Sequence, residues 1–169
     1  MDDAGGPPPA FVVDTMLGRL ARWLRAMGYD TLYLRVARDR RLQEVARGEN
    51  RVLVTRDVRL ARLAAPRSCL VSAEALEGQI AEVVARLGLM PCAEAWLSRC
   101  LECNTRLEAR SREALQGRVP PYVLATQETF MGCPGCGRTY WAGSHVERML
   151  ERLNRLLGRS AEPPGRARP

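Results

Sequence analysis

Four of the six cysteines in this 169-residue chain form two C-x-x-C pairs, and this spacing is the strongest constraint on the fold. The pairs are CLEC at 100–103 and CPGC at 133–136. A two-residue gap lets a tight turn aim both sulfurs at one ion, and two such turns supply the tetrahedral shell that zinc prefers. We therefore predict a structural zinc ribbon whose ligands are Cys100, Cys103, Cys133 and Cys136. An iron site of similar geometry and a redox dithiol are the alternatives.

A closed four-cysteine site has no open coordination position, so we expect any catalysis to lie elsewhere. The sequence opens with MDDAGGPPPA, which lacks the basic and apolar regions of a secretory signal. We therefore expect a cytoplasmic protein, whose thiols stay reduced or bind metal. No stretch approaches the ~18 consecutive apolar residues that a membrane span requires, so we expect no membrane partner.

The region before the cysteines alternates short apolar runs with stretches of helical periodicity. Strands are predicted at 11–13, 31–35, 51–55 and 68–72. Helices are predicted at about 15–27, 40–47 and 73–87. Strands that alternate with helices indicate right-handed crossovers and a parallel sheet, so we predict an α/β domain over residues 10–90.

The rest of the chain divides into a small module, a helix and two tails. Residues 91–143 contain turns and the paired cysteines and form the predicted ribbon. Residues 144–157 are predicted as an amphipathic helix with Ser144 and Glu147 at capping-box spacing. We expect this helix to dock on the core, with a homodimer contact as the alternative. Residues 1–9 and 158–169 have the composition of disordered tails, the second of them basic.

Three aspartates fall near the predicted carboxyl ends of the parallel strands: Asp14, Asp39 and Asp57. Ligands bind at this edge in open α/β sheets, and carboxylates that meet there repel one another unless a divalent cation neutralises them. The alternative is that each one is a helix N-cap. We predict a Mg²⁺ or Mn²⁺ site at these three residues. Possible additional acids are Asp30, Glu44 and Glu49.

The net charge is +7, and all 26 basic residues are arginine. Genome base composition or thermal adaptation would also explain this usage, but the guanidinium fork pairs well with phosphate and favours a nucleic-acid partner. The first helix carries Arg19, Arg22 and Arg25, predicted on the face away from its apolar side. We predict that they hold an RNA backbone, although each of them could simply face solvent.

Two further residues are candidates for the same surface. Arg56 lies beside Asp57 and could contact RNA or anchor a loop carboxylate. His145, with Tyr140 and Trp141, could stack on RNA bases, although the first residue of a helix is more often a surface residue.

Four segments in this order resemble the Mut-seven C-terminal RNase family: FVVDTMLGRLARWLRAMGYDT, RVLVTRD, SRCLECN and CPGCGRTYWAGSHVERM. The resemblance covers about residues 11–150. It implies a PIN-like nuclease domain with a zinc ribbon on its C-terminal side, and a Mg²⁺- or Mn²⁺-dependent ribonuclease. Matched by position, it supports Asp14 and Asp57 as acidic ligands, Asp39 less firmly, and the four cysteines as zinc ligands.

The leading hypothesis is a metal-dependent ribonuclease of single-stranded RNA, in which an ion held by the aspartates activates water for attack on phosphorus. The competing hypothesis is a non-catalytic RNA- or ribosome-binding module, in which the aspartates are caps and the ribbon makes the contacts. A third is an oligomeric scaffold built on the last helix.

Overall fold

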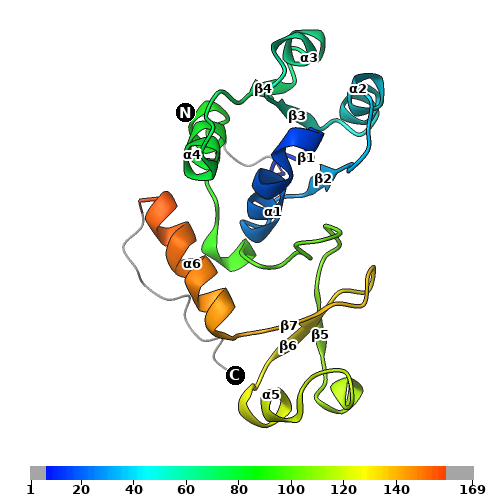
Figure 1. The fold of residues 1–169 in the computed structure, drawn as a ribbon, viewed down its shortest axis with the longest axis vertical. Helices are drawn as coiled ribbons and strands as arrows, with labels where there is room; N and C mark the ends of the chain where they lie inside the picture. Colours follow the sequence, from blue (N-terminus) through cyan, green and yellow to red (C-terminus); the bar gives the residue numbers. More distant parts are fainter. Residues whose placement is uncertain (1–6, 159–169) are drawn as a thin grey trace.

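The computed structural model describes residues 7–158, and its first lobe is built on a four-stranded parallel sheet (Figure 1). The strands lie in the order β2-β1-β3-β4. Their bounds are Phe11–Val13 for β1, Thr31–Tyr33 for β2, Val52–Thr55 for β3 and Ser68–Leu70 for β4. Val13 pairs with Tyr33 on one side and with Val54 on the other. The carboxyl ends of the two central strands, β1 and β3, therefore lie side by side.

Helices cover both faces of this sheet. A short 3-10 turn at Thr15–Leu17 leads into α1 (Gly18–Ala26), which packs with α4 (Leu76–Arg86) against one face. The other face contacts α2 (Asp39–Gly48) and α3 (Val58–Leu63). Successive strand residues point to opposite faces, so Phe11 and Val13 enter the first core and Val12 the second. The predicted α/β fold with a parallel sheet flanked by helices is confirmed.

Two details of the sequence prediction differ from the structure. Helix α3 was missed because it is only six residues long and follows β3 after two residues. The predicted capping box at Ser144 is wrong, because helix α6 (Ser144–Leu156) has Gly143 as its N-cap and no side-chain capping bond. Ser144 is already the first helical residue, so its side chain is placed one position too late to cap.

The second lobe contains a three-stranded antiparallel sheet in the order β5-β6-β7 (Figure 1). Its strands are Glu108–Arg110, Phe130–Gly132 and Thr139–Trp141. Short helical segments at Ala93–Ala95, Glu113–Leu115 and α5 (Pro121–Thr126) complete it. The lobe has a small core of its own, made by Leu115, Val119, Val123 and Phe130. Small cores of this kind commonly depend on a further source of stability such as a structural metal, and the cysteine cluster described below could hold one.

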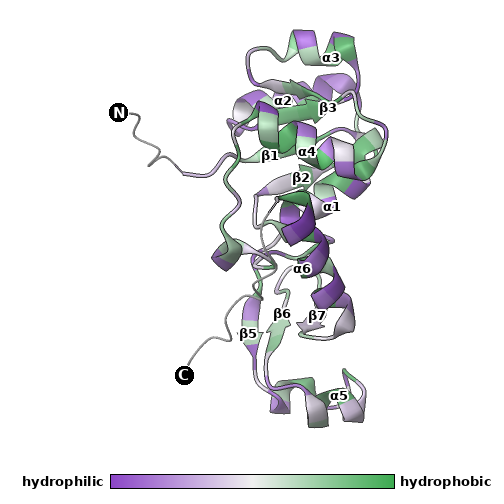
Figure 2. Ribbon diagram, turned by 90° about the vertical axis from the view of Figure 1, so that its left-hand side faces the viewer, coloured by the Kyte–Doolittle hydropathy of each residue, from purple (hydrophilic) through white to green (hydrophobic). Residues whose placement is uncertain are grey.

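Helix α6 returns from the ribbon to the first lobe and packs against α4 (Figure 1). Met149 and Leu153 are buried in the same core as β1 and α1. The Arg152 guanidinium lies 5.1 Å from the ring centre of Trp23 and forms an ion pair with Glu77. The outward face of the helix is hydrophilic (Figure 2). This packing places the last described helix against the first strand and the first helix.

The two lobes are joined beside the edge strand β2 by one buried residue from each side. Arg25 is 5% exposed, and its guanidinium donates to the backbone oxygens of Thr31, Leu101 and Glu102 at 2.9 to 3.0 Å. Asn104, from the ribbon, accepts from the Thr31 amide and donates to Asp30 Oδ1, both at 2.9 Å. Backbone polar groups at the junction are thus paired although they are removed from water.

A close backbone approach strengthens the same junction at Gly28. This residue has a φ of +91°, and a Cβ there would lie 2.4 Å from the carbonyl oxygen of Ala95. Leu97 donates its amide to the Ala26 oxygen at 2.8 Å in the same region. Only glycine fits both the left-handed backbone and the contact, so the segment entering the ribbon lies directly on the end of α1.

Across residues 7–158, no helix has the length and apolar character needed to cross a bilayer.

Candidate active site and metal centre

Two of the predicted aspartates are linked through one threonine at the carboxyl ends of β1 and β3. Thr55 Oγ1 donates to Asp14 Oδ2 at 2.7 Å and accepts from the backbone amide of Asp57 at 3.0 Å. Asp14 is 7% exposed, whereas Asp57 is open to solvent. The strand order places this pair where β1 connects outward to β2 and the chain returns on the other side at β3. In open α/β sheets such a switch point is where ligands bind.

Asp57 also caps α3, which agrees with the alternative interpretation that the aspartates are helix N-caps. Its Oδ1 accepts from the Leu60 amide at 2.8 Å. Asp14 precedes the 3-10 turn but makes no side-chain capping bond, and Asp39 is the first residue of α2 after its N-cap, Arg38. Capping therefore accounts for one oxygen of Asp57 and for neither of the other two carboxylates.

The third predicted ligand does not complete a cluster. Asp39 is exposed in the first turn of α2. Among the described residues, the four cysteines are the only group of three or more His, Cys, Asp or Glu whose ligand atoms all lie within 4.8 Å of one another. The structure thus connects the Asp14 side chain to the Asp57 backbone through Thr55 and leaves Asp39 apart from such a group.

The possible additional acids have other partners. Asp30 precedes β2 and Glu49 precedes β3, so both lie at the amino edge of the sheet, opposite Asp14. There they bind Arg51, at 2.6 and 2.8 Å respectively. Burial raises the pKa of Asp30, but hydrogen bonds from Arg51 and Asn104 outweigh it and hold that pKa below its usual value. Glu44 pairs with arginines on the exposed side of α2.

The donors at Asp14 and Asp57 fit a hard divalent cation. Asp14 Oδ1 and Oδ2 each accept one hydroxyl bond, from Thr15 and Thr55, which leaves further lone pairs on both oxygens. Asp57 uses Oδ1 for the cap, and its Oδ2 is available to a ligand. Mg²⁺ is commonly held by only one or two carboxylates, with waters and substrate phosphates as its other ligands. Two acids are therefore sufficient for such a site.

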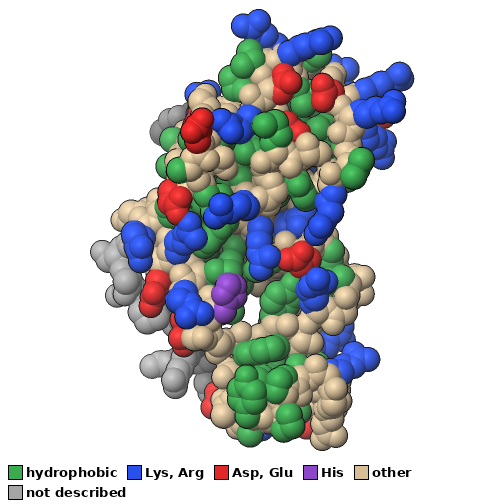
Figure 3. Space-filling model, viewed as in Figure 1, with side chains coloured by type: hydrophobic (Ala, Val, Ile, Leu, Met, Phe, Trp, Pro, Cys, Tyr) green, Lys and Arg blue, Asp and Glu red, His purple; other side chains and the backbone are tan. Residues whose placement is uncertain are grey.

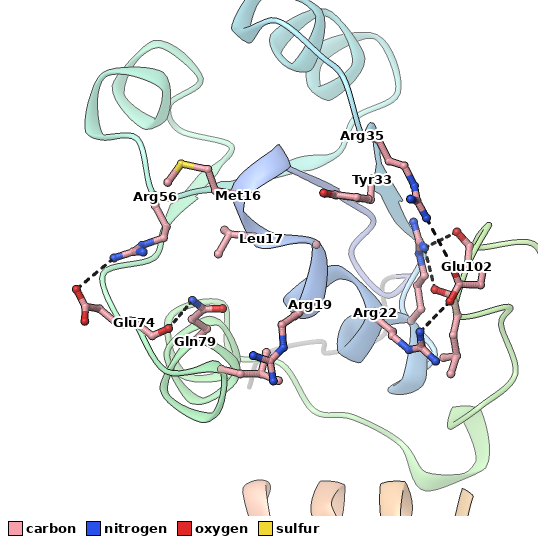
Figure 4. Close-up of a pocket in the computed structure, with 14 residues that line it drawn as sticks. Met16, Leu17, Arg19, Arg22, Tyr33, Arg35, Arg56, Glu74, Gln79 and Glu102 are labelled. Carbon is pink, nitrogen blue, oxygen red and sulfur yellow. Dashed lines mark hydrogen bonds and ion pairs between the residues drawn. The ribbon is translucent and has the colours of Figure 1, made fainter. Parts of the chain in front are cut away.

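A basic pocket of about 590 Å³ extends over the start of α1, and its lining includes Arg56, which precedes Asp57, but neither Asp14 nor Asp57 (Figure 4). Its walls come from α1 and the turn before it, from the segments that follow β2, β3 and β4, and from the ribbon segment around Glu102. Five arginines line it: Arg19, Arg22, Arg25, Arg35 and Arg56. The space-filling view shows cationic side chains gathered across the middle of this face (Figure 3).

Two glutamates form ion pairs with some of these arginines. Glu102 accepts from Arg22 Nη1 at 2.8 Å and lies 3.8 Å from Arg35 Nη2. On the other side of α1, Glu74 lies 4.0 Å from Arg56 (Figure 4). Arg19 points into the space between these pairs (Figure 4). The pocket thus already holds carboxylates at positions where an incoming phosphate would meet guanidinium groups.

One of the predicted RNA-binding arginines has a structural role. The prediction that Arg25 lies on the exposed face of α1 is wrong, because the ribbon covers it and uses its guanidinium to bind backbone oxygens. Arg19 and Arg22 remain accessible, and Arg56 is half-buried. His145 is exposed on α6, at an apolar pocket discussed below.

The four cysteines lie together as predicted, at the junction of the two ribbon loops. Their sulfurs are all within 4.8 Å, with 3.2 Å between Cys103 and Cys133 and 3.6 Å between Cys100 and Cys136. A tetrahedral zinc site places sulfurs about 3.8 Å apart, so this donor set fits zinc. The hydroxyl of Tyr140 lies 3.1 Å from Cys100 Sγ and fixes that ligand from outside the cluster.

The thiols are arranged so that they cannot all ionise without a cation. Burial raises the pKa of Cys103, but hydrogen bonds with Thr105 outweigh it and lower the pKa to about 6. Burial and the neighbouring Cys103 sulfur raise the pKa of Cys133 to about 12. Thiolates this close repel one another, and a bound cation removes that repulsion. The cluster therefore has the chemistry of a structural metal site.

Both cysteine loops use the same turn. The Cys100 amide donates to Thr105 at 2.8 Å, and the Cys133 amide donates to Arg138 at the same distance. The residue after each loop, Asn104 or Gly137, has a φ of +72° or +74°. Asparagine and glycine are the residues that adopt this conformation most easily. In the first loop the same asparagine also binds β2, so the turn that presents the sulfurs also holds the ribbon in place.

Sequence reasoning missed three residues that build this region. Thr55 joins the acids, Glu102 binds two pocket arginines, and Tyr33 donates to the Thr15 oxygen at 2.9 Å beneath the pocket. The threonine had a usable signal, because it ends a strand two residues before an acid in VLVTRD. Glu102 had no such signal in the sequence, since its partner Arg22 is 80 residues away along the chain.

Comparison with known proteins gives one match. The family model described as the Mut7-C RNAse domain matches residues 9–153, which include both lobes and most of α6. Searches of curated proteins and of solved structures each returned no match.

Proposed function

The chain belongs to the Mut7-C RNAse domain family, and we propose that it is a Mg²⁺- or Mn²⁺-dependent ribonuclease that hydrolyses single-stranded RNA. The observation that carries this proposal is the pairing of Asp14 and Asp57 through Thr55, beside an arginine-lined pocket. Carboxylates next to a basic groove suit metal-assisted hydrolysis of a phosphodiester, because the groove binds the polyanion and the acids hold the cation.

In the proposed site, Asp14 and Asp57 hold a divalent cation. Such a cation lowers the pKa of water and neutralises charge that develops on the phosphate. Thr55 keeps the buried Asp14 carboxylate in one orientation by donating to Oδ2. It also accepts from the Asp57 amide, which ties the start of the loop that carries Asp57 to the end of β3. Preorganisation of this kind is a large part of the rate enhancement at charged transition states.

The pocket arginines hold the strand on either side of the acids. Arg19 and Arg22 are exposed on α1, and the half-buried Arg56 follows β3. Arginine binds phosphate through two parallel N–H groups and stays charged at any relevant pH. The arginines of the pocket lie along α1 and beside it, which suits a single strand whose backbone lies across α1. Zinc in the ribbon has a structural role, because four cysteine ligands leave no open position.

The proposal is tested by cleavage of a labelled single-stranded RNA with added Mg²⁺ or Mn²⁺, using the zinc-loaded full chain. We expect Asp14→Asn and Asp57→Asn to reduce the rate by more than the roughly 10- to 100-fold that loss of a supporting group costs at metal sites. Glu128→Gln, an exposed acid in the ribbon, should retain full activity.

The Asp57 variant separates the two roles of that residue. Asparagine caps helices about as well as aspartate, so Asp57→Asn should keep α3 and the melting temperature. Unchanged cleavage in this variant would contradict a metal-binding role and leave only the cap. Tight RNA binding without cleavage under either cation would instead support the non-catalytic RNA-binding module.

A further inference from the structure

A second pocket, of about 220 Å³, lies between the two lobes and is almost entirely apolar. It is enclosed by the ribbon strands, the start of α6 and the segment that enters the ribbon. Its wall includes Tyr140 and Trp141 from β7, His145 and Met149 from α6, and Leu101. In the space-filling view a hollow between the lobes lies directly below the gathered cationic side chains (Figure 3).

This apolar pocket adjoins the basic pocket. Arg22 and Leu101 line both of them, so they form the boundary between the two. Arg22 is about half exposed, and its guanidinium is held by Glu102 at the boundary itself. An RNA strand whose phosphates contact the arginines of the basic pocket therefore has the apolar pocket within reach of its next nucleotide.

The aromatic wall is rigid. The hydroxyl of Tyr140 is bonded to Cys100 Sγ, so the metal cluster fixes its ring. Trp141 packs against the ribbon core. A second, shallower hollow of about 170 Å³ shares Tyr140, Trp141, His145 and Val146, so the apolar surface continues on the other side of these residues. Rigid aromatic side chains at a concave site are the usual means of holding an unstacked base.

We propose that this pocket binds one nucleobase of the single-stranded RNA whose backbone occupies the basic pocket. The proposal rests on the proposed function, and it makes the ribbon a part of the substrate site. An apolar cavity of about 150 Å³ is enough to bind benzene, so 220 Å³ accepts an aromatic base. The apolar lining and the few polar groups favour stacking over base-edge hydrogen bonds, so we expect little discrimination among the four bases.

An apolar side chain of a protein partner is the other kind of occupant that such a pocket accepts. The charge at its boundary favours RNA, because Arg22 lies between this pocket and the one that five arginines line. Each unit of RNA supplies a flat aromatic group and a phosphate together, which matches an apolar pocket that adjoins a basic one. A protein segment would need an apolar residue followed by acidic ones.

The test compares two labelled ten-nucleotide ligands by fluorescence anisotropy, without added Mg²⁺ or Mn²⁺ so that no cleavage occurs. One is ordinary single-stranded RNA, and the other has the same sugar-phosphate backbone without bases. Stacking of one base is worth enough that we expect about 10-fold tighter binding of the ordinary RNA. Ala142→Trp should fill the pocket from an exposed position and bring this ratio close to one. Affinity for the abasic strand should not change, because the arginines are untouched.

Two further variants test whether the effect comes from filling the pocket. Thr129→Trp fills the same pocket from the neighbouring segment, through the residue that precedes β6 and lies across from Ala142, and should have the same effect. Ala125→Trp places the same ring on exposed α5, outside the pocket, and should leave the ratio at its wild-type value. Zinc content and melting temperature are measured for each variant, so that a ribbon that has not folded is recognised.

The outcomes separate this inference from the proposed function. Equal affinity of the wild-type chain for the two ligands overturns the base site, whereas metal-dependent cleavage in the separate assay would still support the ribonuclease. A preference for ordinary RNA that persists in both filled variants also overturns it. No binding of either strand and no cleavage would overturn both proposals, and capture of an apolar peptide in place of RNA would overturn the base site alone.

Discussion

The hydroxyl of Thr55 donates a hydrogen bond of 2.7 Å to Asp14 Oδ2, joining the ends of the two central strands. Both residues are buried, and the same oxygen of Thr55 accepts from the Asp57 amide. One hydroxyl therefore sets the orientation of a buried carboxylate and holds the backbone of the residue that carries an exposed one. In a site that needs two acids at a fixed spacing, the residue between them is as important as either acid.

Thr55→Val keeps the shape and strand preference of the side chain but removes the hydroxyl. The Asp14 carboxylate then loses its closest donor, and the Asp57 amide loses its acceptor. We expect the free energy of unfolding to fall by about 1–3 kcal/mol and cleavage to fall by roughly 10- to 100-fold. Thr55→Ser restores the hydroxyl and should recover most of both. Urea unfolding and cleavage rates measure the two effects, and full activity in Thr55→Val would contradict the positioning role.

Glu102→Gln tests whether the acid in the first cysteine loop competes with RNA for the pocket arginines. The substitution removes a negative charge from Arg22 and Arg35 but keeps the backbone oxygen that Arg25 binds. From the usual strength of exposed ion pairs we expect about two- to fivefold tighter RNA binding at low salt. The effect should shrink as salt rises, because screening weakens both the ion pair and the phosphate contacts.

The matched control for this experiment is Glu74→Gln. Glu74 is 91% exposed and lies 4.0 Å from Arg56, so its removal should change the affinity less. Anisotropy titrations at two salt concentrations compare the variants. Weaker binding in Glu102→Gln would show that the glutamate positions Arg22 for RNA, which is the opposite of competition.

Arg25→Met tests the joint between the lobes. Three backbone oxygens lose a charged donor, and two of them belong to the loop that presents the zinc ligands. We expect a loss of about 3 kcal/mol, since hydrogen bonds to charged groups are worth more than neutral ones. Arg19→Met on the exposed side of the same helix should change stability by less than about 0.5 kcal/mol. Urea unfolding followed by tryptophan fluorescence measures both, and equal midpoints would contradict the role of Arg25.

Much of the fold follows from local pattern. The four short apolar runs were predicted as strands because β-branched and aliphatic residues cluster there between helical stretches, and all four pair in parallel. The cysteine cluster was predicted because the spacing within each pair alone limits where the sulfurs can point. Both signals are contained within a few residues, so no knowledge of distant contacts was needed.

What the sequence left open depends on distant contacts. Periodicity placed Arg25 beside Arg22 on a polar helix face, and only the packing of the ribbon, about 76 residues further along, buries it. Asp30 and Asp14 look alike in the sequence, since each adjoins a strand. One precedes its strand and the other follows, so they lie at opposite edges and have different partners. The exact ends of each strand, to within one or two residues, decide at which edge of the sheet an aspartate lies. Strand propensity does not locate these ends so closely.

Cys103→Ser tests the metal site and its connection to the RNA pocket. We expect zinc content to fall well below one equivalent and the melting temperature to drop, because a small ribbon core depends on its metal. Cys92→Ser is the control, since Cys92 is an exposed free thiol outside the cluster. Zinc is measured by metal analysis of the purified chains.

The same variant should also weaken RNA binding, although no cysteine is placed in contact with RNA. Glu102 and the backbone oxygens bound by Arg25 lie in the loop between Cys100 and Cys103, and Tyr140 on the apolar pocket is fixed by Cys100. Loss of the metal frees that loop and that ring together. The preference for ordinary over abasic RNA should therefore disappear, while binding to the arginines of the first lobe persists. A zinc-free variant that keeps the full preference would show that the ribbon takes no part in holding the base.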